Sequence, residues 1–325
     1  MTAPHRRIRP ARLLPPLPMP LPLVRATVHP VYRIAFNHRL PWTTQRRLLD
    51  LTALLQPLPK GTAVQPMTLA GRRAERVTAG PVEGREAILY LHGGGFTVGS
   101  MRTHRSLAAY LARDTRRPVY LLDYRLAPEH PYPAGMDDTL AALRALADEH
   151  GHPADSIVLG GDSAGGGIAL AAAQQLLTRD DAKPAALVLI SPWTDPNVIP
   201  ERHRDLVINR TWGSACVAAY LGQGDPADPR FAPRWGTLAG LPPTYIHINT
   251  TELLYDPCTE LATAMREAGV ALRFVESTTL WHCAQAQAGL LREAADSLRD
   301  IADFLTREIW AAREDSGSAR PGALG

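Results

Sequence analysis

The most regular feature of the chain is a series of short apolar runs that alternate with longer stretches of helical periodicity. Six runs are expected to be strands: Ala87–Leu91, Pro118–Leu122, Ser156–Leu159, Ala186–Ile190, Thr244–Ile248 and Leu272–Val275. Five stretches are expected to be helices: Thr103–Arg113, Met136–Glu149, Ala164–Leu177, Thr259–Glu267 and Gly289–Trp310. Apolar strands separated by helices are typical of a mostly parallel sheet covered on both faces, so the fold class predicted is α/β.

The N-terminal region has a different pattern. Leu13–Val24 carries five prolines, a density that predicts an extended, polyproline-like arm in place of a helix. Thr43–Leu55 has the apolar spacing of a short helix, and Gln65–Thr78 could form a β-hairpin that turns near Ala70-Gly71. Residues 1–60 are therefore interpreted as an arm followed by helices that cover the sheet.

One later segment also breaks the alternation of strands and helices. Residues 196–240 contain several prolines, Trp212 and Trp235, and no strand-like run. We expect this insertion to fold with the N-terminal region as a helical cap. The expected organisation is an N-terminal arm and cap (1–60), a first part of the core (61–195), the cap insertion (196–240), a second part of the core (241–312) and a polar, disordered tail (313–325).

Charge and composition exclude several classes of protein. The net charge is +3 over 325 residues, but nine arginines and one acid, Asp50, fall in the first 50 residues, which leaves the rest of the chain at about −5 and argues against a nucleic-acid groove on its main body. Three cysteines are too few and too scattered for a disulfide framework or a zinc knuckle. No run is long and apolar enough to span a membrane. The prolines make a signal peptide the weaker interpretation of the basic N-terminus, so a cytoplasmic location is expected.

The strongest local signal is Gly161-Asp162-Ser163-Ala164-Gly165, which fits G-x-S-x-G. It follows an apolar run and opens an Ala-rich helical stretch, which is the strand–turn–helix context of a nucleophile elbow. The glycines Gly161 and Gly165 let strand and helix approach closely, and the helix N-terminus places partial positive charge where an oxyanion develops. Ser163 is therefore the candidate nucleophile.

A second motif, His92-Gly93-Gly94-Gly95-Phe96, ends the run Ala87–Leu91. Successive glycine N–H groups can stabilise a tetrahedral oxyanion together with the N–H that follows the nucleophile, here that of Ala164. A structural role is expected for His92. A phosphate-binding loop is the alternative, but neither G-x-G-x-x-G nor G-K-[ST] is present.

An activated serine needs a base and a carboxylate that orients the base, in the chain order Ser, acid, His. His282 is the only histidine beyond residue 247, and it follows the last expected strand. The acid candidates are Asp256, Glu252 and Glu260. Asp256 is favoured because Pro257 should keep it extended and out of the next helix.

Together these residues resemble the hormone-sensitive-lipase-like family of α/β-hydrolases, in its bacterial carboxylesterase branch. The resemblance extends from about residue 86 to the last helix, and it includes Leu91–Phe96, Asp123–Ala134, Gly161–Gly166, Ser191-Pro192-Trp193, Gly240–Pro243 and Tyr255-Asp256-Pro257. It implies the α/β-hydrolase fold with a helical cap. It also implies that Ser163, Asp256 and His282 form the triad and that Gly93, Gly94 and Ala164 form the oxyanion hole, with Gly95 structural. A homodimer is common in the family.

The resulting prediction is a serine carboxylesterase that hydrolyses short-to-medium-chain acyl esters and uses no cofactor and no metal. Phe96 and Trp281 flank the motifs and are candidate substrate-pocket residues. The alternatives are N-acetyl or amide hydrolysis on the same triad, a non-catalytic receptor of this fold, and a membrane-surface role for the basic arm. The receptors that share this fold lack the catalytic histidine, which is present here as His282.

Overall fold

The computed structural model describes residues 18–180, 182–201 and 205–311. Its centre is an eight-stranded sheet in the order β1-β2-β4-β3-β5-β6-β7-β8. The strands are β1 (Thr62–Leu69), β2 (Arg72–Ala79), β3 (Ala87–Leu91), β4 (Val119–Leu122), β5 (Ile157–Asp162), β6 (Leu187–Ile190), β7 (Thr244–Asn249) and β8 (Leu272–Ser277). Pairing is antiparallel between β1 and β2 and between β2 and β4, and parallel across the rest of the sheet.

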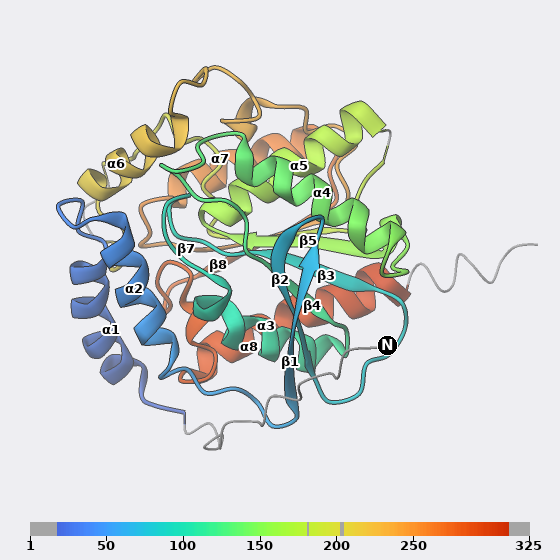
Figure 1. Ribbon diagram of the computed structural model, residues 1–325, viewed down its shortest axis with the longest axis horizontal. Coiled ribbons are helices and arrows are strands. Elements are labelled where there is room, and N and C mark those ends of the chain that lie inside the picture. Colours follow the sequence, from blue (N-terminus) through green and yellow to red (C-terminus); the bar gives the residue numbers. More distant parts are fainter. Residues whose placement is uncertain (1–17, 181, 202–204, 312–325) are drawn as a thin grey trace, which may run out of the picture.

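Helices cover both faces of this sheet, as the sequence predicted (Figure 1). The α-helices are α1 (Leu21–Ala35), α2 (Trp42–Ala53), α3 (Met101–Thr115), α4 (Ala134–Asp148), α5 (Ala164–Asp180), α6 (Arg210–Leu221), α7 (Tyr255–Glu267) and α8 (Arg292–Asp303), which continues as a π-helical turn, Phe304–Trp310. Helices α4, α5 and α7 lie on one side of the sheet, and α3 and α8 on the other (Figure 1). The six predicted core strands and five predicted helices are all present, with ends that differ by a few residues.

Complete burial explains why the central strands are so apolar. Every residue of β3, β4, β6 and β7 is buried, because helices pack on both faces. The elbow glycines are required for close packing here: a Cβ on Gly165 would lie 2.1 Å from the carbonyl oxygen of Leu91, and one on Gly161 would lie 2.5 Å from the backbone of Gly165. Strand β5 and helix α5 can therefore approach this closely only with glycine at both positions.

The prediction of an extended arm is wrong where the structure describes it. Helix α1 begins at Leu21, with Pro20 as its N-cap residue and Pro22 in its first turn. Proline is tolerated there because the first N–H groups of a helix have no intrahelical acceptor. Pro30 lies inside α1 but on its exposed side, where water can bind the carbonyl that loses its partner. Residues 1–17 and the predicted disordered tail from 313 lie outside the described residues.

The N-terminal helices pack against the segment predicted to be an insertion. The Phe36 ring, which follows α1, lies 4.4 Å from the Trp212 ring of α6 between centroids. The Trp212 indole N–H donates to Gln45 Oε1 of α2 at 2.8 Å, and the Asn209 amide donates to the Phe36 carbonyl at 3.1 Å. In the described part of 196–240 there is no strand. The predicted hairpin is also present, as β1 and β2 with their turn at Ala70-Gly71.

Within the residues that the structure describes, no helix is both long and apolar enough to cross a bilayer.

Candidate active site

Ser163 lies on a sharp turn between β5 and α5. Its φ of 50° is in the left-handed region, which a non-glycine residue adopts at a cost in strain. The turn is held by its backbone, since the Ser163 N–H donates to the Ile190 carbonyl at 2.9 Å and the Ser163 carbonyl accepts from Trp193 at 2.9 Å and from Gly167 at 3.1 Å. This is the geometry expected of a nucleophile elbow, and Ser163 lines the pocket beside it.

The glycine turn after β3 forms one wall of the same pocket. Gly93 was predicted to supply an oxyanion donor, and this prediction is wrong because its N–H already donates to Asp162 Oδ1 at 3.1 Å. Among the described residues no hydrogen bond uses the N–H of Gly94 or Gly95. Both glycines have positive φ, 126° and 57°, so the turn directs successive N–H groups differently from a regular strand. The free donors beside Ser163 are therefore those of Gly94, of Ala164, the first residue of α5, and of Gly95, for which only a structural role was predicted.

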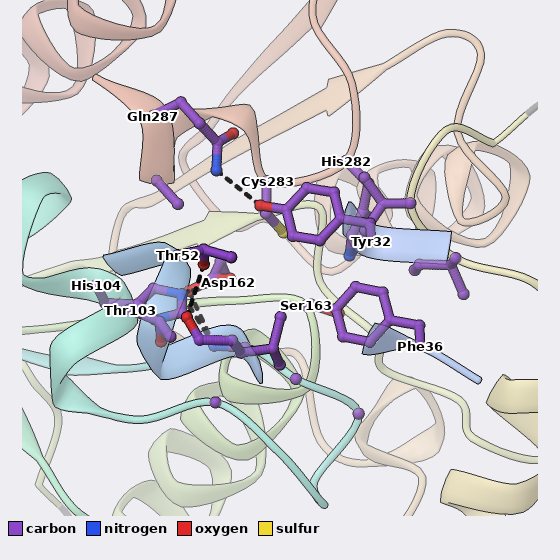
Figure 2. A pocket seen from close by; sticks show the side chains of 18 of the residues that line it. Tyr32, Phe36, Thr52, Thr103, His104, Asp162, Ser163, His282, Cys283 and Gln287 are labelled. Carbon is purple, nitrogen blue, oxygen red and sulfur yellow. Dashed lines mark hydrogen bonds and ion pairs between the residues drawn. The ribbon is translucent and has the colours of Figure 1, made fainter. Parts of the chain in front are cut away.

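The buried carboxylate of Asp162 holds this glycine turn in place. Asp162 is 2% exposed and lies 3.0 Å from His104 Nε2 of α3, while His104 Nδ1 contacts Thr103 Oγ1 at 2.8 Å. Burial alone would raise the pKa of Asp162, but the adjacent His104 outweighs burial and lowers it. The Asp162 side chain thus remains an acceptor for the Gly93 N–H, and it ties the glycine turn to α3 and to the elbow (Figure 2).

His92 is buried and packed within the glycine turn. Its Nδ1 lies 2.9 Å from the Gly93 carbonyl, and its ring stacks on Tyr124 at 4.4 Å between centroids. Burial and the neighbouring His104 lower the pKa of His92 to about 4, so the ring is neutral near pH 7. A neutral ring in this position packs the turn without adding charge beside Ser163.

The partner of His282 is a glutamate. His282 Nδ1 lies 2.6 Å from Glu252 Oε2, and both side chains are buried, at 4% and 1% exposed. Glu252 Oε1 accepts from the Ser191 hydroxyl at 2.8 Å and from the Asn249 N–H at 2.9 Å. Three donors therefore hold the carboxylate in one orientation.

The prediction that Asp256 orients His282 is wrong. Pro257 does not keep Asp256 extended: helix α7 begins at Tyr255, so Asp256 and Pro257 both lie in its first turn, where a proline breaks no intrahelical bond. Glu252 lies in the turn directly after β7, three residues beyond Asn249. The distance from the strand end is the signal that favours it over Asp256.

Two opposing influences act on the pKa of His282. Burial alone would lower it, but the negative charges of Glu252, Asp205 and Asp162 outweigh burial and raise it above its usual value. The imidazolium form is therefore stabilised. This is the form that a general base adopts after it has taken a proton.

The pocket that contains Ser163 and His282 has walls from distant parts of the chain (Figure 2). Tyr32, Phe36, Leu49, Thr52 and Ala53 come from the N-terminal helices and their connection, and Val207, Ile208 and Trp212 from the insertion. Figure 2 shows the Tyr32 hydroxyl meeting the Gln287 amide, which donates to it at 2.7 Å. The sequence analysis assigned none of these residues to the pocket, because no local motif marks them.

Neither aromatic residue predicted for the pocket lines it. Phe96 is 3% exposed and stacks on Tyr220 with ring centroids 3.8 Å apart, so it supports the glycine turn from the protein interior. Trp281 is 4% exposed and its indole N–H donates to Gln287 Oε1 at 3.3 Å. Proximity to a motif in sequence did not place either ring in the cavity.

One trio of side chains in the described part of the chain is close enough to hold a metal ion: Asp205, Glu252 and His282, with ligand atoms within 4.8 Å of one another. The atoms that would bind an ion already make hydrogen bonds, some of them within the trio. His282 Nδ1 faces Glu252 directly, and the two oxygens of Asp205 accept backbone N–H groups. The trio is better suited to holding a proton on the imidazole than to coordinating an ion.

The fold, the strained serine and the buried His–Glu pair define an α/β-hydrolase. A protein-family profile described as the alpha/beta hydrolase fold matches residues 88–286. An esterase from Acinetobacter venetianus is 34% identical, over 80% of this chain and 88% of its own length. An acetyl-hydrolase from Streptomyces hygroscopicus is 36% identical, over 69% of this chain and 75% of its own. A solved esterase of the bacterial hormone-sensitive lipase family matches with a TM-score of 0.83 and 35% identity, over 88% of this chain and 98% of that one.

The chain thus belongs to the α/β-hydrolase family, in its hormone-sensitive-lipase-like group, and is a carboxylic ester hydrolase.

Proposed function

We propose that the esterase acts through a Ser163–His282–Glu252 triad, with the N–H groups of Gly94, Gly95 and Ala164 as the oxyanion hole. The single observation that carries this proposal is the 2.6 Å contact between His282 and Glu252 in the pocket that Ser163 lines. A buried carboxylate on Nδ1 places the proton there and leaves Nε2 free to accept the serine proton.

The chemistry then follows from these positions. His282 takes the Ser163 proton as Oγ attacks the ester carbonyl, and the oxyanion receives hydrogen bonds from the free N–H groups of the glycine turn and of α5. His282 next protonates the leaving alcohol. Water, deprotonated by the same imidazole, attacks the acyl-enzyme and releases the acid. The residues carry out each step without a cofactor.

We also propose that short acyl chains are preferred. The free volume of the pocket is about 80 Å³, well below the roughly 150 Å³ of a cavity that holds a benzene ring. Apolar residues of the N-terminal helices and the insertion surround it, so α1, α2 and α6 serve as a cap that limits chain length. The name of the acetyl-hydrolase relative fits this size. The predicted domain boundaries, homodimer and cytoplasmic location stay predictions.

A series of p-nitrophenyl esters from acetate to palmitate tests this function. We expect the highest kcat/KM on acetate to butyrate and at least a tenfold loss from butyrate to decanoate, because each added methylene must then displace cap side chains. Protein first inactivated with a dialkyl p-nitrophenyl phosphate is the blank. Equal rates across the series would contradict the short-chain preference, and no hydrolysis of any ester by folded protein would contradict the proposed mechanism.

The raised pKa of His282 predicts the pH profile. The base is inactive when protonated, so kcat/KM should fall on the acid side with an apparent pKa above about 6.5, the ordinary value for histidine. Initial rates on p-nitrophenyl acetate between pH 5 and 9 measure it. Circular dichroism at each pH separates this limb from acid unfolding. An acid limb below the ordinary value would contradict the electrostatics described for this site.

A further inference from the structure

A second carboxylate, from the insertion, lies beside the His282–Glu252 pair. Asp205 is partly buried, and one of its oxygens lies within 4.8 Å of the ligand atoms of both Glu252 and His282. No step of the proposed mechanism uses this residue. Its place is unusual because it enters the site from the segment that covers the core, whereas Ser163, Glu252 and His282 all follow core strands.

The two oxygens of Asp205 join two different parts of the protein. Oδ1 accepts the N–H groups of Val207 at 2.8 Å and of Ile208 at 2.9 Å, both on the same segment. Oδ2 accepts the N–H of Leu253 at 2.8 Å, across 48 positions of sequence. Asp205 therefore links its own segment to the loop after β7.

Both ends of this link are functional parts of the pocket. Val207 and Ile208 line the cavity beside Ser163. Leu253 directly follows Glu252, whose carboxylate contacts His282. One side chain thus connects the insertion wall of the pocket to the loop that carries Glu252.

We propose that Asp205 is a positioning residue that ties the acyl-pocket wall to the Glu252–His282 pair and supplies a further negative charge to the His282 imidazolium. This inference rests on the proposed triad. The charge acts when it is needed most, because His282 becomes positive as Ser163 attacks the ester. At a separation of a few ångströms in a water-poor site, one additional negative charge favours that state substantially.

The other charged groups near His282 come from the core of the fold, whereas Asp205 comes from the insertion. Glu252 faces Nδ1 from the loop after β7, and Asp162 acts from the end of β5. The adjacent Cys283 is a neutral thiol, since burial and nearby acids raise its pKa well above the usual value. Asp205 is the contribution of the insertion to this set, and it is among the charges that raise the pKa of His282.

The substitution Asp205→Asn tests the proposal. Asparagine keeps an oxygen for the Val207 and Ile208 N–H groups but removes the charge and places an amide against the Leu253 N–H. We expect the acid limb of kcat/KM to move about one pH unit lower, and the plateau of kcat to fall about tenfold. The limb moves to lower pH because the imidazolium is less stabilised without this charge, which lowers the pKa of His282.

The matched control is Asp225→Asn, in the same insertion. Asp225 also accepts a backbone N–H from two residues ahead, that of Ala227 at 2.9 Å, but it is exposed and outside the pocket. Its substitution should leave both the limb and kcat unchanged. Asp205→Ser is a second neutral variant that keeps an oxygen for the segment, in case the asparagine variant does not fold. Asp205→Glu keeps the negative charge at this position. Its acid limb should therefore lie closer to that of the wild type than the limb of Asp205→Asn does.

A merely structural role would lower the melting temperature and the rate without moving the acid limb, and that result would overturn the proposal. So would a limb that moves equally in the Asp225→Asn control. Failure of the proposed triad is seen separately, in the wild-type protein, as absence of ester hydrolysis or of labelling at Ser163. The two failures are therefore distinguishable.

Discussion

The Ser163→Ala protein is expected to lose about 10⁴- to 10⁶-fold in kcat/KM on short esters, the range for removal of a serine nucleophile. The reason is that no acyl-enzyme can form without Oγ, whereas the oxyanion donors and the pocket remain. The measurement is the burst and steady-state release of p-nitrophenol, with a fluorophosphonate label followed by intact-protein mass.

Folding is not expected to suffer, because alanine at the same left-handed backbone position meets no larger steric cost than serine. The control is Ser156→Ala, directly before β5, where the hydroxyl donates to the Pro153 carbonyl at 2.7 Å. That protein should keep its label and its rate. Full labelling of Ser163→Ala at another residue would identify a different nucleophile.

The second large effect is expected at Glu252. In Glu252→Gln, the amide oxygen should face the Asn249 N–H, as Oε1 does at 2.9 Å, which turns the NH2 group toward His282. Nδ1 must then act as an acceptor, so the proton moves to Nε2, and the imidazole can no longer take the serine proton. We expect kcat/KM to fall by about 10³- to 10⁴-fold, the effect of a wrong histidine tautomer.

The paired variant is Asp256→Asn, in the first turn of α7. It removes a carboxylate from the same region but leaves the contact between His282 and Glu252 intact, and kcat/KM should stay within about threefold of wild type. Steady-state kinetics on p-nitrophenyl acetate, with thermal melts of both proteins, measure the difference. The reverse outcome, a collapse in Asp256→Asn and near-normal activity in Glu252→Gln, would reinstate Asp256 as the acid.

The core could be predicted from sequence because complete burial leaves an unambiguous pattern. Residues 87–91 are all apolar since helices cover both sheet faces, and the structure places β3 at those same residues. The elbow could also be predicted from sequence, because glycine at 161 and 165 is explained by the close approach of strand and helix, which leaves no room for a Cβ. Each of these features depends on local sequence alone.

The errors arose where one residue type permits two conformations. Prolines at 20 and 22 were interpreted as extended, although they suit the start of a helix equally well. Pro257 was likewise interpreted as extended, although it lies in the first turn of α7, and for this reason Asp256 was favoured over Glu252 as the acid. Gly93 could not be distinguished from Gly95 as an oxyanion donor, since the choice depends on a hydrogen bond to Asp162, 69 positions away. The pocket wall likewise depends on long-range contacts.

The position of α1 has a consequence for the order in which the enzyme is made. Tyr32 binds the Gln287 amide across 255 positions, and Met19 donates to the Leu290 carbonyl at 2.9 Å. Helix α1 therefore reaches these partners only after the chain has been synthesised through Leu290. The pocket that Tyr32 and Gln287 both line can be completed only then, so a chain that stops short of these residues cannot form a finished site.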